Sequence, residues 1–148
     1  MKTPLITVYV VNHNYGRFLE KSVESVLEQD FEDFEIILID DGSTDNSHLL
    51  LDQYEKNGRI NVIRQKNKGL IITNNIALKM SKGKYIMRLD ADDFLDPQAL
   101  KLLSSQLESN EKNALIFPDY WEVNEDGVIL KRVERHNFDK EVTLFDMP

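Results

Sequence analysis

The sequence has no cysteine, and its 148 residues include only four prolines, six glycines and one tryptophan. The lack of cysteine excludes a disulfide framework, a thiolate nucleophile and a zinc–thiolate site, and it fits a reducing compartment. No apolar run approaches the ~20 residues that a membrane span needs, and Met1-Lys2-Thr3-Pro4 leads into a strand-like segment without a signal-peptide pattern. We therefore expect a cytoplasmic protein with no transmembrane segment in this chain, either free or peripheral at the inner face of the membrane.

Basic residues are also scarce, with 18 lysines and arginines against 26 aspartates and glutamates, and the formal net charge is −8. Nucleic-acid binding is therefore not expected, because it calls for a basic face. An acidic protein that handles phosphates needs a metal ion or a few placed cations. The 41% hydrophobic and 30% charged residues are typical of a soluble globular protein, and the length suffices for one domain without disulfides or a structural metal.

The order of the apolar patterns predicts an α/β domain with a mostly parallel sheet and right-handed crossovers. Asn14 is the expected N-terminal cap of the first helix. Ile72, Ile76 and Met80 mark the third helix, and Gly83 is expected to close it. The predicted strands are 5–11, 34–39, 60–64, 85–90 and 114–117, the predicted helices are 17–29, 44–57, 72–80 and one starting at Asp96-Pro97, and a hairpin over 121–130 turns at Asp126-Gly127.

Polar clusters follow four of the predicted strands, three of them directly. In an open parallel sheet, ligands bind outside the carboxyl ends of the strands, where loops from several strands meet. Loops are often polar for solubility alone, but paired acids after both the second and the fourth strand favour a site at this edge. The clusters are Asn12 to Asn14, Asp40-Asp41, Lys66 to Gly69 and Asp90 to Asp93.

The run Asp90-Ala91-Asp92-Asp93 places three carboxylates within four residues at the end of the fourth strand. In an extended segment an Asp-x-Asp spacing points both side chains to one side, and hard oxygen ligands suit Mn²⁺ or Mg²⁺. We therefore expect Asp90 and Asp92 to bind a divalent cation, with water or phosphate oxygens at its other positions. The alternative is that Asp92 and Asp93 are solvated loop residues that cap the next helix.

The acid pair Asp40-Asp41 ends the second strand. A carboxylate here can accept a hydrogen bond from the imide or lactam N–H of uracil, thymine or guanine, so Asp41 is a candidate residue for binding a nucleobase. The alternative is that the pair caps the helix that opens at Thr44. A metal on the fourth strand and a base on the second would leave room between them for a nucleoside diphosphate. The cations that could bind its phosphates are Lys66, Lys68 and Arg88. The alternative is that these side chains are simply solvated.

Four segments, in this order and spacing, resemble the nucleotide-sugar-binding half of an inverting family 2 glycosyltransferase of the GT-A fold: ITVYVVNHNY, IILIDDGSTD, NKGLIITNNIAL and SKGKYIMRLDADDFL. The resemblance runs from about Leu5 to Leu107. It implies a Rossmann-like, mostly parallel sheet flanked by helices, with a C-terminal hairpin. It also implies metal-dependent transfer of a sugar from a nucleotide-diphosphate sugar to a hydroxyl acceptor such as a glycan or a lipid-linked glycan. The donor expected first is a UDP-sugar. Such transfer belongs to polysaccharide, cell-wall or glycoconjugate synthesis.

The resemblance also implies roles for individual residues. The backbone of Val11 and the side chain of Asp41 would lie around the base, with Asp40 close by. Asp90 and Asp92 would form the DxD motif, with Asp92 as the direct metal ligand and Asp90 nearer the ribose or the sugar. The full set of implied nucleotide-sugar contacts is Val11, Asn12, Asn14, Asp40, Asp41, Asn67, Gly69, Asn74 and Asp90.

The chain departs from the family pattern in two places. Thr73-Asn74-Asn75 stands where the family commonly has Ala-Arg-Asn, so the usual arginine is missing. The general base of the family lies well past the DxD motif, and no segment before Pro148 matches it, so the catalytic residue is unknown and expected beyond Pro148. We therefore expect 1–131 to be the nucleotide-sugar-binding domain and 132–148 to be the incomplete start of a truncated acceptor half.

Two other functions fit parts of the pattern. Without its acceptor half, the chain would be a nucleotide-sugar-binding module without turnover. Mg²⁺-dependent phosphotransferases and receiver domains also place aspartates at strand ends, but a receiver needs its phosphoacceptor after strand three, where this chain has Arg64. The three histidines lack metal-ligand spacing, and we expect Tyr120 and Trp121 to pack in the core or at a sheet edge rather than on a sugar.

Overall fold

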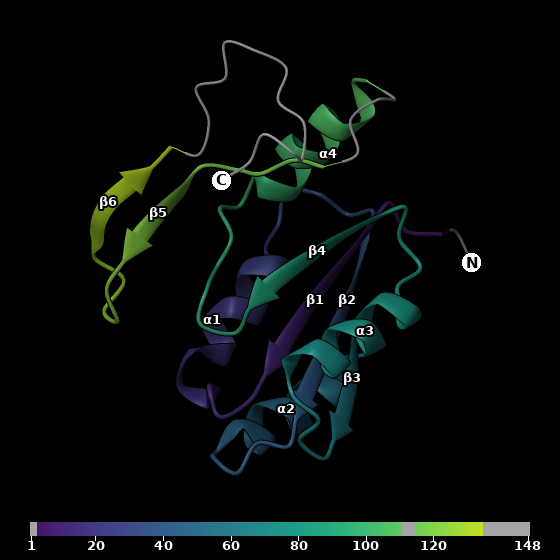
Figure 1. Ribbon diagram of the computed structural model, residues 1–148, viewed down its shortest axis with the longest axis vertical. Coiled ribbons are helices and arrows are strands. Elements are labelled where there is room, and N and C mark those ends of the chain that lie inside the picture. The colour runs from purple at the N-terminus through teal and green to yellow at the C-terminus, as the bar shows by residue number, and fades with distance from the viewer. Residues whose placement is uncertain (1–2, 111–114, 135–148) are drawn as a thin grey trace. The chain divides into compact units, whose positions relative to one another are not determined.

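The computed structural model describes residues 3–110 and 115–134. The chain divides into two compact units, Met1–Ser104 and Ser105–Pro148. The first unit contains one parallel sheet with strand order β3-β2-β1-β4, and the second contains an antiparallel hairpin of β5 and β6 (Figure 1). The strands are β1 Ile6–Asn12, β2 Phe34–Asp41, β3 Ile60–Gln65, β4 Tyr85–Asp90, β5 Tyr120–Val123 and β6 Ile129–Val133, and the helices are α1 Gly16–Leu27, α2 Ser47–Asn57, α3 Leu70–Met80 and α4 Ala99–Glu108.

The two central strands, β1 and β2, are buried on both faces. Ile36, Ile37, Leu38 and Ile39 are nearly inaccessible, which explains why β2 is a continuous apolar run rather than an alternating one. Each such side chain stabilises the fold by about 1.5–3 kcal/mol relative to exposure. Among the described residues β4 pairs with β1 alone, and its side chains alternate between half-buried and exposed until the buried Leu89. Most of the buried apolar surface of the sheet therefore belongs to its two central strands.

Two hydrophobic layers cover the sheet. One face packs against α1, α2 and the first turn of α4, through a cluster that includes Val8, Leu38, Val23, Leu51 and Leu100. The other face packs against α3 through Tyr9, Ile37, Ile39 and Ala77. The helices thus lie on both faces of a parallel sheet (Figure 1), as the sequence predicts. No helix within the described ranges is long and apolar enough to cross a membrane.

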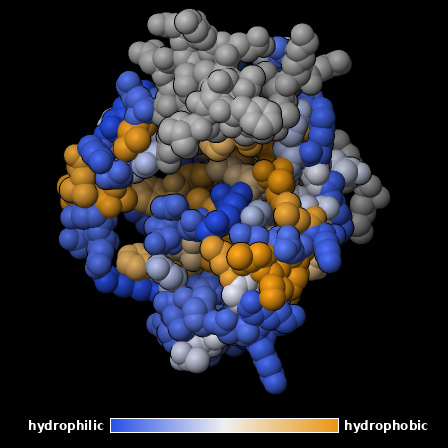
Figure 2. All heavy atoms as spheres, in the orientation of Figure 1, coloured by the Kyte–Doolittle hydropathy of each residue, from blue (hydrophilic) through white to orange (hydrophobic). Residues whose placement is uncertain are grey.

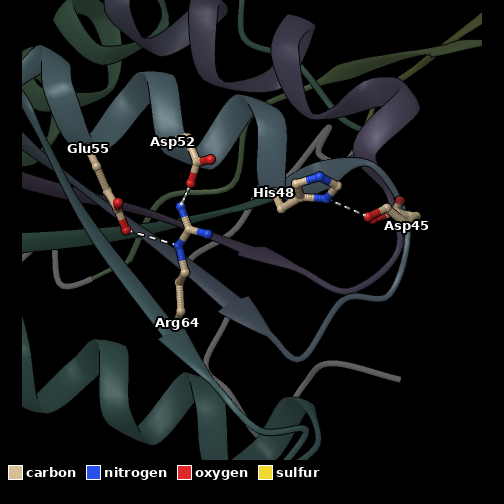
Figure 3. Close-up of polar contacts among 5 residues, drawn as sticks. All are labelled: Asp45, His48, Asp52, Glu55 and Arg64. Atoms are coloured by element: carbon tan, nitrogen blue, oxygen red, sulfur yellow. Dashed lines mark hydrogen bonds and ion pairs between the residues drawn. The ribbon is translucent and has the colours of Figure 1, made fainter.

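Arg64 joins the outer strand β3 to α2 (Figure 3). Its Nη2 donates to Asp52 Oδ1 at 2.5 Å and its Nε donates to Glu55 Oε1 at 2.9 Å. The hydrogen bond to Asp52 is the largest cause of the raised pKa of Arg64. Because these side chains are largely exposed, the ion pairs are expected to contribute only about 0.2–1 kcal/mol each. Arg64 is therefore a structural cation rather than a phosphate ligand.

Two predictions about helix ends were wrong. Asn14 does not cap α1: the capping position is Tyr15, and no side chain caps the helix. Asn14 instead adopts a left-handed backbone with φ of 63°, which asparagine tolerates better than most residues. Gly83 does not close α3, because the helix ends at Met80 and Ser81 is already extended. Gly83 is needed for a close approach, since a Cβ atom there would lie 2.4 Å from the backbone nitrogen of Thr7.

The inward face of α3 also differs from the prediction. Thr73 and Ala77 are buried, whereas Ile72 and Met80 are exposed. Small side chains let the helix axis approach the sheet, and the Thr73 hydroxyl accepts a hydrogen bond from Gln65 Nε2 at 2.8 Å. The inward face of α3 therefore combines a polar contact of Thr73 with the apolar packing of Ile76 and Ala77.

The described residues of the predicted strand 114–117 do not form a strand. Ala114 lies outside the described residues, Leu115 to Phe117 are irregular, and β5 begins at Tyr120. The hairpin itself is confirmed, with Gly127 at a positive φ in its turn. Trp121 is 56% exposed on β5 of the two-stranded sheet, with the Arg132 guanidinium 5.9 Å from its ring centroid, so of the two predicted positions, core or sheet edge, it takes the sheet edge.

Candidate functional site at the carboxyl edge of the sheet

The register of the sheet places the predicted site residues in one row across its carboxyl edge. Gln65 of β3 pairs with Asp41 of β2, and Asp40 pairs with Asn12 of β1. On the other side of β1, Val11 pairs with Asp90 of β4. The order of the strands reverses between β1 and β4, and in open α/β sheets ligands bind at such a switch point. The structure thus brings together residues from three separate sequence clusters.

Asn12 and Asp40 fasten the ends of β1 and β2 to each other. The buried Asn12 donates from Nδ2 to Asp40 Oδ1 at 2.8 Å and to Ser43 Oγ at 3.0 Å. Asp40 also accepts from the Ser43 hydroxyl at 2.5 Å and from the Ser43 backbone N–H at 3.2 Å. Both side chains are therefore satisfied within the protein and shape the turn that follows β2.

Asp41 holds the loop that leads into α3. Its side chain accepts from Gln65 Nε2 at 2.7 Å and from the backbone N–H groups of Lys68 and Gly69 at 2.9 Å each. Burial acts to raise the pKa of Asp41, but the donors from Lys68, Gln65, Gly69 and Thr73 together lower it below its usual value. Asp41 is thus an ionised, 3% exposed carboxylate that holds the two residues before α3 and does not cap the helix that opens near Thr44.

Asn14 and Asp45 arrange the neighbouring loop. Asn14 Oδ1 accepts from the backbone N–H of Thr44 at 2.7 Å, and the Asn14 backbone N–H donates to Ser43 Oγ at 2.9 Å. Asp45 accepts from the Gly16 and Ser47 N–H groups at 2.9 and 3.0 Å. Burial favours a higher pKa for Asp45, yet these donors and the Ser47 hydroxyl lower it. The loops after β1 and β2 therefore form one hydrogen-bonded unit.

The loop of residues 66–69, called the Asn67 loop below, packs against the turn after β2. Gly42 has φ of +76°, and a Cβ atom there would lie 2.6 Å from the Asn67 backbone nitrogen. The Asn67 amide lies 3.2 Å from His13 Nε2. In α3, Asn74 Oδ1 is buried and has no hydrogen-bond partner among the described residues. A buried unsatisfied polar atom is costly and is often explained by a ligand or a water.

The acids at the end of β4 differ in their surroundings. Arg88 Nη2 forms an ion pair with Asp90 Oδ1, which places a cation beside the first acid. Asp92 is exposed, and no hydrogen bond or ion pair within the described ranges uses its carboxylate. Desolvation raises the pKa of Asp93, and the like charges of Asp92 and Asp90 add to this effect. The three carboxylates do not converge on a point, since no group of three metal-ligating side chains occurs within the described ranges.

Several residues of this site were missed from the sequence. Gln65, Ser43 and the backbone N–H of Asp45 bind the side chains of Asp41, Asn12 and Asn14, and His13 lies beside Asn67. The available signal was position: each follows or ends a strand at the carboxyl edge of the sheet. Lys66 and Lys68 lie in the loop after β3 and are exposed, while Asn67 and Gly69 meet Asp41 and His13 as described.

An open parallel sheet with acids and oriented N–H groups at its switch point is the architecture of nucleotide-binding α/β enzymes. The comparison with protein families is more specific. The chain belongs to glycosyl transferase family 2, which matches residues 7–144. The predictions of this family and of a GT-A-type α/β fold with a C-terminal hairpin are confirmed, and a Mg²⁺-dependent phosphotransferase finds no support.

Individual relatives agree with this assignment. The chain is 32% identical to chondroitin synthase of Escherichia coli over 130 residues, which cover 87% of this chain and 19% of that synthase. TarS 1–349 of S. aureus in complex with UDP-GlcNAc has a TM-score of 0.66 at 25% identity, covering 72% of this chain and 32% of that one. Mannosyltransferase PcManGT of Pyrobaculum calidifontis, in complex with GDP-Man and Mn²⁺, has a TM-score of 0.65 at 21% identity over 72% and 33% of the two chains. The last likeness shows the fold alone.

Proposed function

We propose that the chain is the donor-binding part of an inverting glycosyltransferase that transfers a sugar from a nucleotide-diphosphate sugar to a hydroxyl acceptor in polysaccharide or glycoconjugate synthesis. The observation that carries the proposal is the row of Asp41, Asn12 and Asp90 at the switch point of a family 2 chain. UDP-GlcNAc in TarS and GDP-Man in PcManGT are the donor classes bound by relatives of this fold. A UDP-sugar is the first donor to test.

The base would lie over the carboxyl ends of β1 and β2. Because the oxygens of Asp41 already accept three hydrogen bonds, a base N–H would have to share or replace one of them. We therefore propose that Asp41 acts mainly by holding Lys68 and Gly69, while the backbone of Val11 and the Asn67 loop line the base. The unsatisfied Asn74 Oδ1 is available to a donor group of the nucleotide sugar.

The acids of β4 fit a divalent cation of the Mn²⁺ or Mg²⁺ type. Asp92 is exposed and offers a carboxylate, and a cation would relieve the repulsion among Asp90, Asp92 and Asp93, which adds to desolvation in raising the pKa of Asp93. Asp92 would be the direct ligand, with Asp90 nearer the ribose or sugar. When bound, such an ion neutralises the diphosphate and acts as a Lewis acid on the departing oxygen. Arg88, beside Asp90, adds a fixed positive charge.

The remaining parts of the proposal concern the whole protein. Residues 1–131 are the nucleotide-sugar-binding domain, and 132–148 begin the acceptor-binding region. Inverting transfer needs a general base for the acceptor hydroxyl, and no residue of this chain is assigned that role. The acceptor is a glycan or a lipid-linked glycan, and the protein acts in the cytoplasm, at the inner face of the membrane.

Calorimetry tests donor binding directly. UDP, GDP and dTDP are titrated with and without Mn²⁺ or Mg²⁺, and we expect metal-dependent binding of at least one nucleotide. Asp92→Asn should remove the metal dependence, while Asp126→Asn, which changes an exposed acid in the hairpin turn, should leave it intact. The proposal fails if none of the nucleotides binds with either metal and Asp92→Asn has no effect. Binding without hydrolysis or transfer would leave a binding module.

A further inference from the structure

The outer face of α3 is apolar and exposed. Ile71 is 80% exposed, Ile72 50% and Leu78 51%. Thr73 and Ala77 form the inner face, and Ile71 and Leu78, seven residues apart, lie together on the opposite side. Figure 2 shows hydrophobic surface in the region of α3. Isolated exposed apolar residues are ordinary, but a continuous group on one helix face indicates a contact surface.

Lysines flank this face along the sequence, and the segment that carries it contains no acid, although Glu35 of β2 accepts from the Lys82 backbone N–H at 2.7 Å. Residues 65–84 contain five lysines and no aspartate or glutamate, whereas the rest of the chain holds 13 basic and all 26 acidic residues. All five lysines are exposed. No ion pair of Lys66, Lys68 or Lys79 occurs within the part of the chain that the structure describes. The segment is therefore a basic, apolar patch on an otherwise acidic protein; the lysines are Lys66, Lys68, Lys79, Lys82 and Lys84.

We propose that α3 docks the domain on an anionic lipid surface. Ile71, Ile72 and Leu78 would enter the boundary between headgroups and acyl chains, and the lysines would lie against lipid phosphates. Exposed apolar side chains of a helix can bury at the boundary between headgroups and acyl chains, and anionic headgroups attract lysines that flank them. This inference stands on α3 and its flanking lysines alone and does not depend on nucleotide binding.

A second copy of the chain fits this face less well. A symmetric dimer through α3 would place the same patch on both partners, so the lysines of the two helices would face each other without acids between them. A lipid surface supplies both an apolar layer and negative charge. Charge complementarity therefore favours lipid.

Vesicle co-sedimentation of the full chain tests the proposal. We expect binding to phosphatidylcholine vesicles that contain phosphatidylglycerol, little binding to pure phosphatidylcholine, and weaker binding in high salt, which shortens the range of electrostatic attraction. The double variant Lys79→Gln/Lys82→Gln should bind roughly 25-fold more weakly, at roughly fivefold for each lysine. Ile71→Ser/Leu78→Ser should also lose binding. Because these side chains are exposed, the thermal unfolding temperature should hardly change.

The matched control lies on another helix. Leu49→Ser/Lys56→Gln changes an exposed leucine and a lysine on α2 and should leave sedimentation unchanged. The proposal is overturned if anionic and neutral vesicles sediment the chain equally, or if neither does. It is also overturned if the chain dimerises in analytical ultracentrifugation through a contact that Ile71→Ser/Leu78→Ser abolishes, or if polyglutamate binds this face and vesicles do not.

Discussion

Replacing Asp41 with asparagine separates a positioning role from direct recognition of the base. The wild-type carboxylate accepts from Gln65 Nε2 and from the backbone N–H groups of Lys68 and Gly69. An asparagine keeps one oxygen and turns an NH₂ group toward the remaining donors. The loop before α3 should then lose part of its attachment to the sheet, whatever the ligand.

The size of the effect follows from the surroundings of the three donors. A hydrogen bond to a charged group contributes about 1.5–3 kcal/mol. Gln65 is partly buried, whereas Lys68 and Gly69 are exposed, so water can replace part of what the two backbone donors lose. We expect Asp41→Asn to reduce the free energy of unfolding by about 2–4 kcal/mol, which lowers the Tm by roughly 10–30 °C for a unit of about 100 residues.

The effect should depend on pH in a defined direction. The folded pKa of Asp41 is lowered, so its stabilisation is fully present above the unfolded pKa of about 3.9 and is lost as the pH falls through the folded pKa. The stability difference between wild type and Asp41→Asn should therefore be largest near neutral pH and should shrink below about pH 4.

Urea unfolding followed by circular dichroism at neutral and acidic pH measures both effects. Asp92→Asn, an exposed acid on the same edge, is the control and should unfold like the wild type. The reasoning is refuted if Asp41→Asn also unfolds like the wild type at neutral pH. If nucleotide binding were lost at unchanged stability, the carboxylate would instead contact the base directly.

Three further substitutions test other parts of the site. Gly42→Ala should lower the free energy of unfolding, measured in urea, by about 2–4 kcal/mol, because its φ of +76° is strained for alanine and the new Cβ would meet the Asn67 nitrogen at 2.6 Å. The control Gly58→Ala, at φ of +71° with open space around it, should lower it by only about 1 kcal/mol. Asn74→Ala should leave the Tm nearly unchanged, because Oδ1 has no partner among the described residues, and should weaken nucleotide binding in calorimetry by about five- to tenfold; an equal loss for the exposed Asn75→Ala would count against a specific contact. Arg64→Gln should cost less than about 1–2 kcal/mol at low salt and less in high salt, and a salt-independent cost in urea unfolding would contradict a screened ion pair.

The sequence predicted the sheet well because its signals are local. The run from Ile36 to Ile39 could only be a buried strand, and the acids at its end had to lie at the carboxyl edge once the strands were parallel. This is why the candidate site could be located before its geometry was known. The strand order and the pairings of Asp40 with Asn12 and of Val11 with Asp90 come from the structure.

The internal bonds of the site could not be predicted in the same way. Asp41 meets Lys68 and Gly69 across 27 and 28 residues, and Asn14 meets Thr44 across 30. Such contacts depend on how loops from different strands fold over one another, and a residue type alone does not reveal whether its oxygens face a ligand or a backbone. The orientation of α3 is a similar case, since Thr73, which bonds Gln65, faces the sheet, whereas Ile72 and Met80 are exposed.

α3 links the two proposals in one rigid element. Its N-terminal loop is bonded to Asp41 at the donor site, while Ile71 to Lys79 on its outer face span about 12 Å of helix. Lys66 and Lys68 lie in that loop, and they can meet lipid phosphate or donor phosphate but not both at once. Docking through Lys66 and Lys68 would therefore compete with the donor, whereas docking through Ile71, Leu78 and Lys79 would leave the loop to the nucleotide. Because coupling between two binding sites is reciprocal, the effect of UDP on vesicle binding must equal the effect of vesicles on UDP binding, and its sign reveals which lysines the membrane uses.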